Sequence, residues 1–276
     1  MVYKKYGDIF RKLREQHHLP LSSFSSAGIS KTALSNFERG ESMMSFEKVV
    51  VALQIMGVSL EEFEHFLNGY SLSDSDFLLE EIEKETVSQN FTKLKMLYTK
   101  ARSQGYPYLA LAAKSSWSAL DEEETEKLVD LLYETEVWGY KEICVCYLTI
   151  NNFSTRDILT IIDSFLVPGQ ELFNSLKYRG YLVQVCCRAV TTLSSRGYKE
   201  YAEHILNRID AYSLVHTMFH RNLRNITKGY WIYCFVDAEE GKAMMSKGIQ
   251  IFKDISTPEV AGYYQSRYEH FVEQLD

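Results

Sequence analysis

Apolar residues recur along this chain at intervals of three and four positions, and few segments alternate strictly between apolar and polar residues. The first spacing places apolar side chains on one face of an α-helix, whereas strict alternation is typical of a half-buried strand. Only 4 prolines interrupt the pattern over 276 residues. The chain is therefore predicted to be all-α, and its length favours a small module followed by a larger one.

Five short amphipathic helices are predicted in the first 70 residues. Ser22, Ser30 and Ser45 are expected to cap the second, third and fourth of them, because a serine hydroxyl accepts a hydrogen bond from a free N–H group at a helix start. Gly28 and Gly40 suit the turns on either side of the third helix, since glycine adopts left-handed backbone at little cost. Short helices joined in this way indicate a helix-turn-helix domain over residues 1–70.

The third helix lies within ISKTALSNFERGES at residues 29–42 and turns a polar face outward. The residues of this face are Ser30, Lys31, Thr32, Ser35, Asn36 and Arg39. Asparagine can pair with adenine, lysine can donate to guanine, and a threonine methyl can contact the methyl group of thymine. An ordinary surface helix is also polar on one side. The surrounding pattern of five helices is what favours contact with DNA.

Residues 3–68 resemble the DNA-binding domain of phage repressors of the Cro/C1 (XRE) type, and LSNFERGES is similar to a segment of the Rgg/GadR/MutR regulators of Gram-positive bacteria. The resemblance implies that a recognition helix begins at Lys31. It implies that Lys31, Thr32 and Asn36 reach base edges, and that the other three residues of the polar face lie near phosphates. It also pairs Arg14 with Glu38 as an ion pair that holds the first helix against the recognition helix.

The net charge of −7 is unevenly distributed. The first 44 residues carry seven lysines and arginines against four aspartates and glutamates, a net charge of +3, so the remaining residues carry −10. A basic end on an acidic body is typical of a protein that contacts double-stranded DNA at one end only.

The sequence contains no HExxH motif, no glycine-rich phosphate loop and no CxxC pair among its 5 cysteines. His216 and His220 share a helix face, but no acidic third ligand lies nearby in the sequence. We therefore expect no enzyme activity, no cofactor and no metal, with the cysteines as ordinary buried thiols. The chain begins with an amphipathic helix, and no segment approaches the ~18 apolar residues of a membrane span, which predicts a cytoplasmic protein without membrane insertion.

Beyond the first domain, a Gly-Tyr dipeptide recurs with glycine at positions 69, 105, 139, 180, 197, 229 and 262. Most of the intervals are close to the ~34-residue period of tetratricopeptide-type repeats. At the start of a repeat the glycine would turn the chain and the tyrosine would pack on the neighbouring helix. Residues 71–276 are therefore predicted to form an α-helical repeat domain.

The segments VWGYKEICVCYL and GKAMMSKGIQIFKDI resemble the corresponding parts of the Rgg regulators. In that family the C-terminal domain is a tetratricopeptide-like solenoid that dimerises and binds a short imported signalling peptide on its concave side. The resemblance thus implies a homodimer engaged in quorum sensing. It places peptide contacts at Asn151, Asn152, Gln184 and Arg188.

Polar residues on otherwise apolar helices also suggest a groove. Gln184 and Arg188 lie four residues apart and share a helix face, as Asn222 and Asn225 nearly do. Burying such groups without partners costs several kcal/mol, so they either face solvent, form a satisfied network or line a groove. In a groove, the amides would hold the backbone of an extended peptide, Arg188 its carboxylate, and Tyr230 would contribute to an apolar pocket.

Two classes of function remain open from the sequence. The first is a dimeric, sequence-specific DNA-binding regulator controlled by a short hydrophobic signalling peptide. The second is a helix-turn-helix regulator or scaffold whose repeat domain binds a partner protein, with no peptide ligand. A constitutive repressor without any ligand is a third hypothesis.

Overall fold

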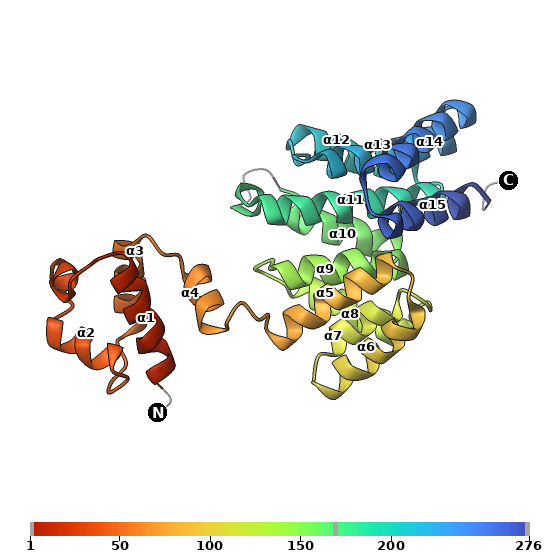
Figure 1. Cartoon of the computed structure of the whole chain (residues 1–276). Coiled ribbons are helices and arrows are strands. Elements are labelled where there is room, and N and C mark those ends of the chain that lie inside the picture. The colour runs from red at the N-terminus through yellow and green to blue at the C-terminus, as the bar shows by residue number, and fades with distance from the viewer. Residues whose placement is uncertain (1–2, 168–170, 274–276) are drawn as a thin grey trace. The chain divides into compact units, whose positions relative to one another are not determined.

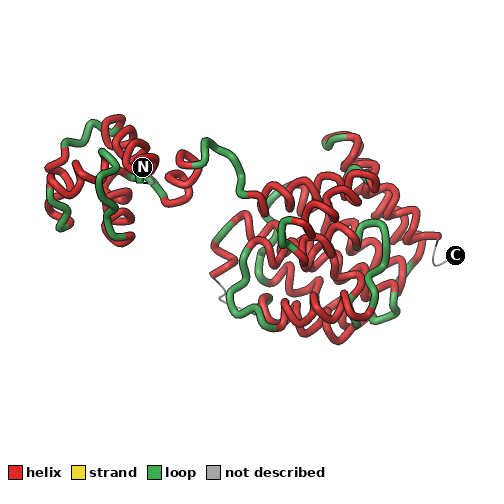
Figure 2. The backbone as a smooth tube through the Cα atoms, turned by 90° about the horizontal axis from the view of Figure 1, so that it is seen from below, coloured by secondary structure: helices red, strands yellow, loops and turns green. Residues whose placement is uncertain are grey.

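The computed structural model describes residues 3–167 and 171–273, without the side chains of residues 271 and 273. Every regular element in these ranges is a helix, as Figure 2 shows. The all-α prediction is therefore confirmed. The chain divides into two compact units, Met1–Ser73 and Asp74–Asp276, which have separate hydrophobic cores.

The described part of the N-terminal unit packs short helices around one aromatic centre. Its elements are α1 (Lys4–Gln16), η1 (Leu21–Ala27), α2 (Lys31–Glu38), α3 (Phe46–Met56) and α4 (Leu60–Leu67) (Figure 1). The fully buried ring of Phe10 lies 6.1 Å from that of Phe24 and 5.4 Å from that of Phe37, measured between centroids. One ring each from α1, η1 and α2 therefore fixes these three segments together, because edge-on aromatic contacts add to the free energy of burial.

The ends of the recognition segment follow the predicted chemistry. Ser30 has extended backbone before α2, and its Oγ accepts a hydrogen bond from the Ala33 N–H at 3.2 Å. Gly28 and Gly40 have φ angles of 71° and 72°, in the left-handed region that glycine tolerates. Gly40 has a second constraint, because a Cβ there would lie 2.6 Å from the Lys4 Cα.

The prediction that Ser22 caps the second helix is wrong. Ser22 lies inside the 3-10 helix η1, which starts directly after Pro20. Pro20 is the N-cap residue and has extended backbone, so the turn begins one residue before the serine. Ser45 does precede α3, but its side chain makes no capping hydrogen bond.

The C-terminal unit is a stack of longer helices. Its described elements are α5 (Asp74–Val87), α6 (Phe91–Ser103), α7 (Pro107–Lys114), α8 (Glu122–Tyr133), α9 (Tyr140–Thr149), η2 (Ile150–Asn152), α10 (Thr155–Phe165), η3 (Glu171–Asn174), α11 (Leu176–Ser195), α12 (Lys199–Ala211), α13 (Met218–Phe235), α14 (Ala238–Ile255) and α15 (Pro258–Glu273). Each odd-numbered helix from α5 to α13 contacts the next odd-numbered one, so these helices form a continuous row. Repeated helical hairpins of this kind form a solenoid, in which each repeat buries its apolar face on its neighbour.

The last helix departs from this repeat. α15 contacts α14 but also α5, at the opposite end of the row. The Gln89 side chain, just after α5, donates to Ser266 Oγ of α15 at 3.2 Å. Arg188 of α11 donates to the Tyr263 hydroxyl at 3.3 Å. α15 therefore crosses the row of odd-numbered helices instead of extending it.

The Gly-Tyr pattern marks repeat starts at only some of its positions. Gly139 is the N-cap residue of α9. The N-cap residues of α7 and α12 are directly preceded by Gly105 and Gly197. Gly180, Gly229 and Gly262 instead lie inside α11, α13 and α15, so that prediction is wrong there. The first two allow close packing, since a Cβ at residue 180 would meet His220 at 2.8 Å and one at residue 229 would meet Met245 at 3.0 Å.

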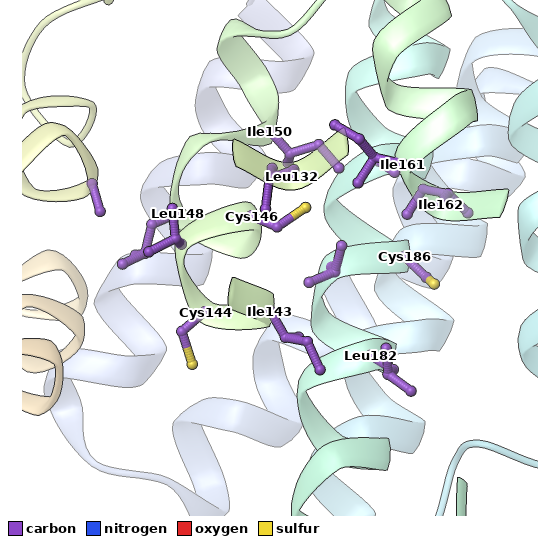
Figure 3. Packing of buried hydrophobic residues seen from close by; sticks show 14 of the residues in the cluster. Leu132, Ile143, Cys144, Cys146, Leu148, Ile150, Ile161, Ile162, Leu182 and Cys186 are labelled. Carbon is purple, nitrogen blue, oxygen red and sulfur yellow. The ribbon is translucent and has the colours of Figure 1, made fainter. Parts of the chain in front are cut away.

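Four cysteines (144, 146, 186 and 187) are buried, and Cys234 is half-buried. Figure 3 shows Cys146 among Ile150, Ile161 and Leu132. Burial raises the pKa of the Cys144 and Cys146 thiols, which keeps them protonated and unreactive. In the described residues, no helix has the length and apolar character needed to cross a membrane.

Candidate functional site

The polar face predicted on α2 is present in the structure. Lys31, Thr32, Ser30 and Arg39 are exposed, and Asn36 is half-buried beside them. Leu34 and Phe37 on the opposite face are fully buried. Since Ser30 uses an oxygen lone pair to cap α2, its hydroxyl hydrogen remains able to donate to a phosphate. The helix therefore exposes several polar side chains that can donate hydrogen bonds.

Arg39 organises this face more than the sequence suggested. Its guanidinium donates to Ser35 Oγ, to Asn36 Oδ1 at 2.6 Å, and to both carboxylate oxygens of Glu41 at 2.7 and 2.8 Å. The side-chain oxygen of Asn36 thus accepts a hydrogen bond from Arg39, while the side-chain nitrogen of Asn36 takes no part in that contact. Glu41 balances the charge of Arg39, so in the DNA-free protein Arg39 positions Ser35 and Asn36.

The Arg14–Glu38 pair expected from the resemblance is formed. Arg14 Nε and Nη2 donate to the two Glu38 carboxylate oxygens at 2.6 and 2.8 Å, and Nη1 donates to the Leu19 carbonyl at 2.8 Å. The side chains are only 11% and 6% exposed. A bidentate pair with this little exposure fixes the angle between α1 and α2, and also anchors the turn that follows α1.

Gly7 permits the same helices to approach closely. A Cβ at this position would overlap the Phe37 carbonyl oxygen and lie 3.0 Å from the Glu38 Cα. The backbone of α1 therefore rests directly on the C-terminal turn of α2, next to the Arg14–Glu38 pair.

In the C-terminal unit, cavities follow the line along which α15 crosses the odd-numbered helices. The first, which we call the acidic groove, has a volume of about 610 Å³. It is lined by Glu80, Glu83, Lys84, Thr86, Val87, Ser88, Tyr140, Tyr147, Tyr181, Gln184, Thr257, Glu259 and Val260. Burial raises the pKa of Glu83, although the Tyr181 and Tyr140 hydroxyls donate to its carboxylate at 3.3 and 3.5 Å.

The second cavity, which we call the basic groove, has a volume of about 440 Å³. It is lined by Asn151, Thr191, Thr192, Ser195, Arg196, Ser266, Arg267 and His270. None of these described residues is acidic. Arg196 donates to the Asn151 and Phe153 carbonyls at 2.9 and 2.8 Å, and burial lowers its pKa.

A third, smaller cavity of about 40 Å³ lies beneath α15, and we call it the covered cavity. Gln184 and Tyr147 line both this cavity and the acidic groove, while Thr191 and Arg267 line both this cavity and the basic groove. The three spaces are therefore neighbours along one face.

Three of the predicted ligand residues face these spaces. Gln184 lines the acidic groove, Arg188 lines the covered cavity and Asn151 lines the basic groove. The Asn151 Oδ1 atom accepts from the Thr192 hydroxyl at 2.9 Å, which leaves its amide nitrogen to donate elsewhere.

The other predicted ligand residues are placed differently. Asn222 is 5% exposed and donates to the Gly248 carbonyl at 2.8 Å, and Tyr230 is fully buried, so neither is accessible to a ligand. Both belong to the packing of α13 on α14. Asn152 bridges the Leu120 N–H and the Thr149 carbonyl and faces a different cavity. Asn225 is half-buried on α13 and lies outside the described linings of both grooves.

Sequence reasoning missed the residues that α15 contributes to this face. Tyr263, Arg267 and His270 lie at helical spacing of four and three, but the same helix mixes polar and aromatic residues on all sides. Arg196 was missed as well. The only available signal was its position at the end of α11, one residue beyond the last helical turn.

Comparison with known proteins agrees with this architecture. A family model described as "HTH-type transcriptional regulator Rgg, C-terminal domain" matches residues 76–266, and a helix-turn-helix model matches residues 10–63. The first match covers more than half of the chain.

Solved structures with a similar fold extend over nearly the whole chain. The SHP pheromone receptor Rgg2 of Streptococcus dysgalactiae has a TM-score of 0.76 at 20% identity, covering 96% of this chain and 99% of that one. A protein from Listeria monocytogenes EGD-e considered a transcriptional regulator has a TM-score of 0.78 at 16% identity, covering 99% of both chains. The structure of the PrgX/cCF10 complex has a TM-score of 0.66 at 14% identity, covering 98% of this chain and 91% of that one. At these identities the likeness establishes the shared fold.

Proposed function

This chain belongs to the Rgg family of helix-turn-helix transcriptional regulators, and from that premise we propose that α2 reads a DNA operator while the C-terminal unit binds a short signalling peptide. The observation that carries the first part is the exposed face of α2, with Lys31, Thr32 and Asn36 presented on a helix whose other side is buried. The positive charge of the first 44 residues supports the same assignment, because phosphate neutralisation supplies much of the affinity for DNA.

A dimer fits this proposal. Helix-turn-helix dimers contact two half-sites about 34–36 Å apart, or a multiple of this distance. A ligand that favours one arrangement of the two reading helices over another would change operator affinity, typically by a coupling of about 1–3 kcal/mol. We assign dimerisation to the C-terminal unit.

Asn36→Ala is expected to weaken operator binding by about 1–3 kcal/mol and to relax preference at one base pair, because asparagine makes a paired contact with a single base. Lys31→Ala should weaken binding to a similar degree. Fluorescence anisotropy with the operator and single-base variants, at two salt concentrations, measures both effects.

Gln54→Ala removes an exposed amide from α3 of the same unit and serves as the matched control. Wild-type affinity and specificity in both Asn36→Ala and Lys31→Ala would remove the two residues from the DNA-reading face.

The two grooves support the peptide part of the proposal. Their volumes, about 610 and 440 Å³, fall within the range of ~300–1,000 Å³ that is usual for ligand sites. The Gln184 and Asn151 amides and the Thr192 hydroxyl face this region, and such groups can hydrogen bond to the backbone of an extended peptide. The solved relatives described as a pheromone receptor and as the PrgX/cCF10 complex share the fold of the whole chain. We place the peptide along the face crossed by α15.

Calorimetry with synthetic peptides encoded by short reading frames beside the gene tests this placement. One such peptide should bind the full chain, and Gln184→Ala should weaken it about threefold to tenfold, since a hydrogen bond contributes about 0.5–1.5 kcal/mol. Gln250→Ala, at an exposed position of α14, should bind like wild type. A peptide that binds both variants equally well would move the site away from Gln184. Failure of every such peptide to bind would favour the partner-protein hypothesis.

A further inference from the structure

Arg188 has an unusual position for a charged side chain. Its Nη1 donates to the Tyr147 carbonyl at 2.6 Å and its Nη2 to the Tyr263 hydroxyl at 3.3 Å. The guanidinium carbon lies 4.7 Å from the centroid of the Tyr147 ring. Its Nε is buried and has no hydrogen-bond partner. Each of these contacts is to a neutral group.

Three other shielded arginines of this chain contact carboxylates. Arg14 contacts Glu38, Arg208 contacts Asp163 and Arg224 contacts Asp210. A shielded charge without an opposite charge is costly, because the loss of hydration is not offset by a nearby counter-ion. The surroundings of Arg188 therefore favour the binding of a negative charge.

The positive charge near Arg188 also affects the Tyr263 hydroxyl. Burial would raise the pKa of its hydroxyl, but Arg188 and Arg267 outweigh this effect and lower the pKa to about 8. The oxygen of Tyr263 accepts from Arg188 and from Arg267, at 3.3 and 3.4 Å. It is thus a neutral oxygen at a position where the local field favours an anion.

The covered cavity limits the size of that anion. Its volume of about 40 Å³ exceeds the ~10–15 Å³ that a single water needs, but it cannot hold several peptide residues. Gln184 and Thr227 add polar side chains to its wall, and Leu223, Ile226 and Met245 contribute apolar surface. One halide ion or one carboxylate group matches both the size and the donors.

We propose that the covered cavity is an anion site, in which the Arg188 guanidinium binds one carboxylate group or halide ion and the Tyr263 hydroxyl is the neutral place-holder in its absence. The anion is either a free ion or a carboxylate of the bound peptide. The second source rests on the proposed function, since the peptide would enter from a groove that shares Gln184 or Thr191 with this cavity.

Thermal unfolding of the full chain in different sodium salts tests the site without any peptide. Trp117, Trp138 and Trp231 all lie in the C-terminal unit, so tryptophan fluorescence reports the unfolding of that unit. At equal ionic strength, chloride or formate should raise the Tm above that in gluconate, which is too large for the cavity. At about ten times the dissociation constant, the expected difference is about 2–5 °C.

Variants separate the site from general salt effects. Arg188→Met should abolish the difference between salts, while Arg221→Met, which removes an exposed arginine from α13, should retain it. Tyr263→Phe removes the place-holder oxygen and should lower the formate concentration that gives half of the shift by at least threefold. If Arg188→Met does not fold, the salt dependence of the Tm of Tyr263→Phe, compared with wild type, still tests the proposal. Identical Tm values in all three salts for wild type and Tyr263→Phe would overturn the proposal, whether or not any peptide binds.

A second comparison identifies the source of the anion. Trileucine with a free carboxyl terminus and trileucine amide are compared under the same conditions, in gluconate. A rise in Tm with the acid alone, lost in Arg188→Met, assigns the site to a ligand carboxylate. No rise with either peptide, together with a shift in formate or chloride, assigns the site to free ions. The anion site stands in both cases, and calorimetry with the encoded peptides tests the proposed function separately.

Discussion

Arg14→Ala is expected to destabilise the N-terminal unit by about 3–5 kcal/mol, the largest effect of any single substitution considered for this protein. The substitution removes both hydrogen bonds to Glu38 and the one to the Leu19 carbonyl. Glu38 is 6% exposed, so its carboxylate would remain buried with no opposite charge. Because the pair also fixes α1 against α2, operator binding should be lost together with stability.

Hydrogen exchange measured by mass spectrometry locates this effect. Peptides from residues 4–67 should exchange faster in Arg14→Ala, whereas tryptophan fluorescence, which reports the C-terminal unit alone, should melt as in wild type. Arg11→Ala is the matched control, because Arg11 lies on the same helix and pairs with Glu15 in an exposed position. Equal exchange in Arg14→Ala and wild type would show that the pair does not stabilise the unit.

Gly7→Ala is expected to destabilise the same unit by up to about 3 kcal/mol, the upper end of the usual cost of overpacking. The added methyl would overlap the backbone oxygen of Phe37, which has no flexible end to move aside. α1 and α2 would have to separate, and the aromatic contact of Phe10 with Phe37 would weaken. Exchange in peptides from α1 and α2, and operator affinity, measure the two consequences.

Gly262→Ala is the control for this substitution, since that glycine lies inside α15 with nothing within 4 Å of the added Cβ. It should be neutral or stabilise the C-terminal unit by up to about 1 kcal/mol, because alanine favours helix more than glycine does. Wild-type stability and binding in Gly7→Ala would mean that α1 and α2 tolerate a wider separation than the structure has.

The N-terminal unit could be predicted closely because its sequence signals are local. The Ser30 cap, the glycines at 28 and 40 and the apolar stripe of α2 each act within a few residues. Two serine caps were predicted wrongly: Ser22 lies inside η1, after the N-cap Pro20, and Ser45 precedes α3 without a capping hydrogen bond. A serine near a helix start therefore predicts the position of the helix better than it predicts the capping hydrogen bond.

The ligand face of the C-terminal unit could be predicted only in part because it depends on pairing between distant segments. Gln184 and Arg188 were found from their spacing on α11, but the contact of Ser266 with Gln89 joins residues 177 positions apart. No periodic pattern encodes such a contact. Asn222 illustrates the same limit, since the close approach of α14 at Gly248 turns a predicted groove residue into a buried hydrogen-bonding group.

The central claim is that the α2 face of this chain reads a DNA sequence. Selection from a random double-stranded DNA library with the purified full chain, followed by sequencing, tests it most directly. We predict that wild type enriches one motif arranged as an inverted repeat, that the Lys31→Ala and Asn36→Ala double variant loses this enrichment, and that Gln54→Ala retains it. No enrichment by wild type, or the same motif recovered by the double variant, would contradict the claim.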